Sequence, residues 1–129
     1  MADASKQDSQ THFSIQKIYV KDLSFESPGS PQIFLEKWEP DVNLQLTNKG
    51  TLLSDSTHEV VLNVTVTVKL KDKIAYLVEV QLAGIFNIMG FDKAQLAAWV
   101  SSYCPQLLFP YAREVVSDLV TRGGFPQLL

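Results

Sequence analysis

The residue types that most often carry catalysis or bind metals are few in this sequence, and they lie far apart. His12 and His58 are the only histidines, and Cys104 is the only cysteine. A zinc site needs His, Cys or carboxylate ligands at close and defined spacing, and a cysteine nucleophile needs a positioned base. Because the sequence shows neither pattern, we predict no catalytic residue, no metal site and no cofactor, and we expect that the chain is not an enzyme.

Asp22 and Glu26 are a carboxylate pair whose spacing bears on acid–base chemistry. On a β-strand a spacing of four places both side chains on one face, about 13 Å apart. That separation is wide for two groups that would share a proton. The pair therefore suits a charged docking face better than an active site.

Motifs for phosphate and nucleic-acid binding are also missing. The sequence contains no G-x-x-x-x-G-K-[ST] loop and no G-x-S-x-G turn. The formal net charge of −3 and the pI near 5.2 argue against a nucleic-acid partner, which needs a concentrated basic face. The longest basic cluster is Lys69, Lys71 and Lys73, and Asp72 interrupts it.

Length and composition indicate one globular domain. The chain has 129 residues, of which 46% are apolar and 19% charged, so we expect another subunit or a ligand to cover some apolar surface. One cysteine allows no disulfide within the chain, which agrees with a reducing cytosol. Residues 1–10 are too polar for a signal peptide, and no run of about 18 apolar residues could span a membrane. We therefore expect a cytoplasmic protein without direct membrane insertion.

The first part of the chain predicts a tail, a strand and an unusual connection. Residues 1–11 are rich in Ser, Gln and Asp and are expected to be disordered. A strand from His12 to Glu26 follows, and its apolar parity changes near Gln16 and Lys17, which indicates a bulge. The connection from Ser27 to Pro40 is long and carries large apolar side chains, so it is expected to have a function or to lie against another surface. These side chains are Ile33, Phe34, Leu35 and Trp38.

Alternation of apolar and polar residues predicts three further strands. The first of them is half-buried, with apolar positions at Val42, Leu44 and Leu46. Asn48–Gly50 are expected to end it. Strict alternation then runs over 59–70 and, after a short polar turn, over 74–82, which predicts an antiparallel hairpin. Gly84 is expected to kink the last strand.

After the last strand the sequence takes on a helical period. Asp92 and Gln95 resemble a capping box, Pro105 is expected to break the first helix, and a second helix is expected to run to about Arg122. The apolar stripe of the second helix is Tyr111, Ala112, Val115, Val116, Leu119 and Val120. Strands first and helices last predict an α+β fold, with a four-stranded antiparallel sheet followed by C-terminal helices packed on one face. Residues 12–129 are expected to form this single domain.

Five segments together resemble one known family. They are Ile18–Glu26, Glu59–Thr67, Gly84–Phe86, Tyr103–Glu114 and Arg122–Leu128. The run from Tyr103 to Glu114 is the most specific, because it carries rare residues in order. The family is SecB, the bacterial protein-export chaperones, and the resemblance covers about residues 12–129.

The resemblance implies an ATP-independent holdase with a SecB-like fold. Such a chaperone binds unfolded preproteins in hydrophobic grooves, keeps them translocation-competent and delivers them to SecA, the ATPase motor of export. The resemblance also implies a homotetramer built as a dimer of dimers. Members of the family usually continue with another helix and an acidic tail, and the role of that tail is not carried over to this chain.

Two groups of residues gain roles from the resemblance alone. SecA docks on an acidic sheet face in the family, and the matching positions are Asp22, Glu26, Leu77 and Glu79. Strand positions to which assembly is sensitive match Val78, Val80 and Leu82, which would then form the tetramer interface. Leu82 departs from the polar residue expected there. The alternative for these three residues is burial under the helices of the same chain.

The client-binding groove is predicted from the residues and the resemblance together. Phe34 and Trp38 are expected to line it together with Val42, Leu44 and Leu46. Aromatic and aliphatic walls bind many sequences because apolar burial is non-directional, and an exposed strand edge could add backbone hydrogen bonds to an extended client. The alternative is that Phe34 and Trp38 only pin their loop to the core.

Two other functions compete with the export holdase. One is a SecB-like chaperone dedicated to an antitoxin of a toxin–antitoxin system. The other is a small-molecule enzyme that uses the apolar groove as a pocket, which would need a polar catalytic constellation that the sequence does not show.

Overall fold

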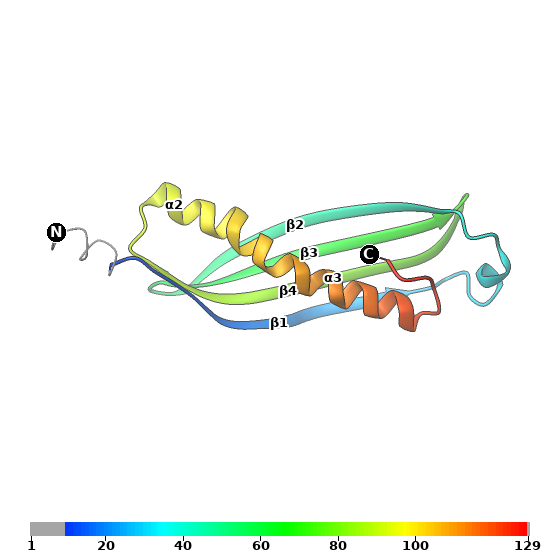
Figure 1. The fold of residues 1–129 in the computed structure, drawn as a ribbon, viewed down its shortest axis with the longest axis horizontal. Helices are drawn as coiled ribbons and strands as arrows, with labels where there is room; N and C mark the ends of the chain where they lie inside the picture. The colour runs from blue at the N-terminus through cyan, green and yellow to red at the C-terminus, as the bar shows by residue number, and fades with distance from the viewer. Residues whose placement is uncertain (1–9, 129) are drawn as a thin grey trace.

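The computed structural model, which describes residues 10–128, has four long strands followed by a helical segment (Figure 1). The elements are β1 (His12–Glu26), η1 (Gln32–Leu35), β2 (Pro40–Ser54), β3 (Thr57–Leu70), β4 (Lys73–Met89), α2 (Lys93–Ala98), η2 (Trp99–Tyr103) and α3 (Cys104–Arg122). The predicted α+β class is confirmed. The tail predicted for residues 1–11 lies outside the described residues except for its last two positions.

The strands form one antiparallel sheet in the order β1-β4-β3-β2. Consecutive hairpins join β2, β3 and β4, whereas β1 lies at the far edge beside β4. The predicted bulge in β1 is confirmed, because the register with β4 skips Gln16, and a second break that was not predicted occurs at Lys21. The two edges of the sheet therefore differ: β1 is interrupted twice, and β2 keeps an unbroken register from Pro40 to Leu52.

The predicted end of β2 at Asn48–Gly50 is wrong, because the strand continues to Ser54. Gly50 remains paired with Val60 of β3. A Cβ atom at Gly50 would lie only 2.1 Å from Cγ1 of Val100 in η2. Here glycine allows a helix to approach the sheet closely, and the turn comes later, at Asp55, whose φ is +32°.

The core lies between the sheet and α3, which crosses the sheet diagonally (Figure 1). The predicted alternation in β3 and β4 is confirmed by burial, since every second residue points to the helix and is buried. From α3 the core receives Cys104, Leu108, Ala112, Val116 and Val120. Gly84, where a kink was predicted, stays in register with both neighbouring strands. A Cβ atom there would lie 2.6 Å from the Phe86 ring and 3.0 Å from Leu108, so this glycine too permits close packing.

The helical segment runs without a break from Lys93 to Arg122. The capping box is confirmed, since the Asp92 carboxylate accepts from the Gln95 amide and the Gln95 side chain accepts from the Asp92 amide. The predicted break at Pro105 is wrong, because the helix continues through this proline. The π-helical turn η2 lies directly before it, where the proline ring and its missing N–H interrupt the regular α-helical hydrogen bonds. In residues 10–128 no helix is both long and apolar enough to cross a membrane.

Candidate functional site

Strand alternation gives the sheet two faces with different chemistry. One face, here called the helix side, carries the apolar residues that α3 partly covers. The other, here called the open face, has no helix over it among the described elements. Residues paired directly across neighbouring strands share a face, so the register assigns each predicted site residue to one of them.

The groove residues of β2 lie on the helix side, beyond the reach of α3. Val42, Leu44 and Leu46 pair with buried valines of β3, but their own exposed fractions are 45%, 52% and 47%. The prediction of a half-buried strand is therefore wrong for the single chain, in which every residue of β2 is exposed. The reason is the path of α3, which runs from β2 at its η2 end towards β1 and leaves most of β2 uncovered (Figure 1).

Phe34 and Trp38 stand at one end of this strip, and each of them is both exposed and anchored. Their exposed fractions are 48% and 36%. Their ring centroids lie 5.0 and 5.8 Å from the ring of Phe125. The sequence left two alternatives for these rings, which were to line a client groove or to pin their loop to the core. In the structure one side of each ring packs against Phe125, and the other side is exposed and could contact a ligand.

Phe125 is the residue that the sequence reasoning missed at this end. It is 6% exposed and lies among the rings of Tyr76, Phe25, Phe34 and Trp38, with centroid distances from 4.9 to 6.4 Å. Gly124 (φ +88°) turns the chain back after α3, and the Phe125 amide then donates to the Val120 carbonyl. The glycine pair before Phe125 was a visible signal for such a turn.

A further apolar surface follows one flank of α3, next to the buried positions Cys104, Leu108 and Ala112. Tyr103, Leu107 and Tyr111 recur at a spacing of four residues, and all three are exposed. Tyr111 belongs to the apolar stripe predicted for this helix, and it lies on the exposed part of that stripe. A hollow of about 620 Å³ opens beside the first two, lined by Phe13, Trp99, Tyr103, Gln106 and Leu107.

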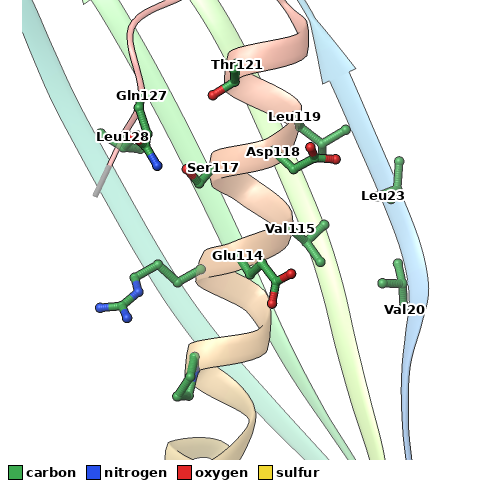
Figure 2. Close-up of a pocket in the computed structure, with 12 residues that line it drawn as sticks. Val20, Leu23, Glu114, Val115, Ser117, Asp118, Leu119, Thr121, Gln127 and Leu128 are labelled. Carbon is green, nitrogen blue, oxygen red and sulfur yellow. The ribbon is translucent and has the colours of Figure 1, made fainter.

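A larger hollow, of about 750 Å³, lies where α3 faces β1. Figure 2 shows Val20 and Leu23 of β1 directed towards Val115 and Leu119 of α3. Val20 and Leu23 share the helix side because the register break at Lys21 lies between them. Its charged lining residues are Arg113, Glu114 and Asp118. Asp118 also forms an ion pair at 2.9 Å with Arg122, one turn later in α3. Such a mixed surface suits a peptide or a second chain.

The four predicted SecA-docking residues are brought together on the open face. Glu26 pairs directly with Leu77, and Glu79 pairs with Ser24 one row further along. Asp22 lies in the next row, opposite Gln81. Asp22, Glu26 and Glu79 are exposed. The grouping agrees with the resemblance, and docking itself stays a prediction.

The open face also holds a polar cluster that the sequence did not reveal. Lys21 Nζ lies 2.9 and 3.1 Å from the two carboxylate oxygens of Glu59, and the Tyr19 hydroxyl donates to the same carboxylate. The hydrogen bond from Tyr19 and then that from Lys21 lower the pKa of Glu59. The hydrogen bond between Tyr19 and Glu59 also raises the pKa of Tyr19 to about 12, because an ionised tyrosine could not donate this bond. The contact joins residues about 40 positions apart, so no local pattern announces it.

Val78, Val80 and Leu82 need a correction as interface residues. They lie on the helix side under α3 with at most 2% exposure. The structure therefore supports the alternative of burial within the same chain. Any effect of these residues on assembly would pass through the position of α3.

Across the described part of the chain, the cysteine and the histidines are not brought together for catalysis. Burial raises the pKa of Cys104 to about 12, so the thiol is a poor nucleophile. Nδ1 of buried His58 has no hydrogen-bond partner. Within residues 10–128, no three His, Cys, Asp or Glu residues are placed to hold a metal ion.

Comparison with known proteins places this architecture in a family. The family model for the preprotein translocase subunit SecB matches residues 6–129. Three relatives named protein-export protein SecB are similar along the chain. The one from Nitrosococcus oceani is 58% identical over 97% of this chain and 77% of its own length, and the one from Methylococcus capsulatus 54% identical over 95% and 79%. The third, from Marinobacter nauticus, is 48% identical over 99% and 78%.

A solved structure shows the same fold. A SecB-like chaperone of Mycobacterium tuberculosis, in complex with a peptide from an antitoxin, superposes with a TM-score of 0.69 over 96% of this chain and 91% of its own. At 19% identity this likeness concerns the fold alone. The antitoxin alternative is not favoured, because the three relatives at 48–58% identity all carry the export name. The chain belongs to the SecB family and is a preprotein-export chaperone.

Proposed function

We propose that this chaperone holds unfolded preproteins along the exposed apolar strip of β2 and its aromatic end. The observation that carries the proposal is the continuity of this strip: Phe34, Trp38, Val42, Leu44 and Leu46 are each about one-third to one-half exposed. A folded chain rarely leaves so much contiguous apolar surface uncovered unless it binds something. Apolar walls accept many sequences, which a generalist client site requires.

The edge of β2 adds a second element to this site. β2 has a strand partner on one side only, and its register is unbroken from Pro40 to Leu52. An extended client could pair with this edge and place alternate side chains beside Val42, Leu44 and Leu46. The β1 edge suits this less, because two register breaks and several charged residues interrupt it.

Delivery and assembly complete the proposal. We infer that Asp22, Glu26, Leu77 and Glu79 on the open face dock SecA. The exposed stripe of Tyr103, Leu107 and Tyr111 supports a homotetramer, built as a dimer of dimers, in which a second chain covers α3. The chaperone works in the cytoplasm, holds clients without ATP and catalyses no reaction.

The test is the refolding of an unfolded precursor in the absence of ATP, with the mass of the complex measured in parallel. The expected result is suppressed refolding by a tetramer. A tetramer that ignores unfolded chains would contradict the holdase proposal and leave a dedicated partner as the explanation. Suppression by a monomer would contradict the proposed assembly while the holding activity stands.

A further inference from the structure

Lys21 occupies the break in β1 that directly precedes the docking carboxylate Asp22. The register with β4 resumes at Asp22, so Lys21 is the residue without a pairing partner. We call the part of the open face that holds Asp22, Glu26 and Glu79 the acidic end. If the Lys21 side chain had no partner, its positive charge would lie next to this end. Its side chain instead forms an ion pair with Glu59 of β3.

Because Lys21 pairs with Glu59, its positive charge lies away from the docking residues. Glu59 lies opposite Ile85 of β4. The docking rows lie at Leu77, Glu79 and Gln81 of the same strand. The ion pair is therefore formed further along the sheet, beyond the row of Asp22 and away from the rows of Glu79 and Glu26.

Tyr19 fixes the carboxylate that receives the lysine. Its hydroxyl donates to Oε2 of Glu59, the oxygen that also contacts Lys21 at 3.1 Å. The Glu59 side chain is 15% exposed and the Lys21 side chain 45%. The Glu59 carboxylate is thus more buried than the Lys21 ammonium group that it binds. Its position is also held by the hydrogen bond from Tyr19, and not by Lys21 alone.

The docking carboxylates themselves are left without cations. Within residues 10–128, the ion pairs join Lys21 with Glu59, Lys37 with Glu39, Lys73 with Glu36 and Arg122 with Asp118. Asp22, Glu26 and Glu79 take part in none of them. The open face therefore has an acidic end, with Asp22, Glu26 and Glu79, and a region around Glu59 where Tyr19, Lys21 and Lys49 lower the pKa of that carboxylate.

We infer that Glu59 and Tyr19 are positioning residues for SecA docking, which hold Lys21 away from the acidic end and so keep that end negative for a basic partner surface. The inference rests on the proposed docking of SecA at the open face. It assigns a function to two residues that need not touch SecA. It also explains why a lysine is compatible with a place beside Asp22.

The experiment is a binding titration with SecA at low ionic strength, for the wild type and five variants, the fifth being Glu79→Lys on the docking face itself. Glu59→Gln releases Lys21 and is expected to weaken binding about three- to fivefold, an effect that fades at high salt. Tyr19→Phe leaves the charges unchanged and is expected to weaken binding by less, since Glu59 loses its anchor. The double variant Glu59→Gln/Lys21→Gln is expected to return to the wild-type affinity. Glu39→Gln, which neutralises an acid of an exposed pair in the loop before β2, is the matched control and is expected to bind as the wild type.

The outcomes separate this inference from the docking proposal. If Glu79→Lys binds SecA as tightly as the wild type, docking at this face is wrong. If Glu79→Lys weakens binding but Glu59→Gln and Tyr19→Phe do not, docking stands and the positioning role is wrong. An equal loss in Glu59→Gln and Glu39→Gln would show a general effect of net charge. Urea unfolding of each variant checks that stability is kept, and failure of the double variant to recover also overturns the inference.

Discussion

Replacing Trp38 by alanine tests the client groove at its aromatic end. A fully exposed tryptophan presents about 250 Å², and Trp38 is 36% exposed, so about 90 Å² of it is open to a client. At about 25 cal/mol per Å² this area is worth about 2 kcal/mol when a client covers it. Since 1.4 kcal/mol corresponds to a factor of ten, Trp38→Ala is expected to weaken client binding by up to about 25-fold.

The rest of the Trp38 side chain packs against Phe125, so stability must be measured alongside affinity. Client affinity is best followed by competition with a labelled unfolded precursor, and folding by urea unfolding. Leu35→Ala is the control for stability, because Leu35 lies in the same short helix as Phe34 but is 87% exposed. It should change the urea midpoint little.

The double variant Trp38→Ala/Phe34→Ala sharpens the result. Both rings contact Phe125, so their effects are coupled and the double loss is expected to be smaller than the sum of the single losses. A double variant that keeps its fold and its assembly and binds clients like the wild type would refute the groove assignment. The two rings would then serve only to pin the loop.

Three further predictions concern the core, the ion pair and the closest contact between helix and sheet. Val80→Asp is expected to destabilise the fold by several kcal/mol, because it buries an unpaired charge under α3; an unchanged urea midpoint would contradict the placement of Val80 in the core. The pKa of Glu59 is lowered in the folded state, so its contribution to stability is present above its unfolded pKa and is lost as the pH falls through the folded value. The stability difference between wild type and Glu59→Gln should therefore shrink on acidification, and a difference independent of pH would show that the ion pair does not matter to folding. Gly50→Ala is expected to cost about 1–3 kcal/mol, since the new Cβ would lie 2.1 Å from Val100, and Val100→Ala should relieve much of this cost; equal losses in both backgrounds would contradict the contact.

The sequence predicted those parts of the fold that local patterns encode. Alternation in β3 and β4 is strict because one face of both strands is buried, and the capping box at Asp92 is a local motif. Gly50 and Gly84 were misjudged for one common reason. In a strand a glycine signals either a break or a close approach, and only the position of the helix decides between them.

The candidate site was predictable to a different degree on each face. Strand period alone puts Asp22 and Glu26 on one side, as the register shows, whereas Leu77 and Glu79 were added to this group by the family resemblance. The exposure of Leu44 could not be foreseen, since it depends on the diagonal path of α3 rather than on any property of β2. The ring of Phe125 and the contact of Tyr19 with Glu59 depend on long-range packing that no short window of sequence contains.

The place of β1 in the sheet has a consequence for the synthesis of the chain. β1 is made first, but its partners lie on β4, which ends at Met89, so the ribosome must complete three further strands before β1 can pair along its length. Loops this long close slowly. A nascent molecule of this chaperone therefore passes through a stage in which an apolar strand waits without a partner. During that stage it resembles the clients that the finished protein binds.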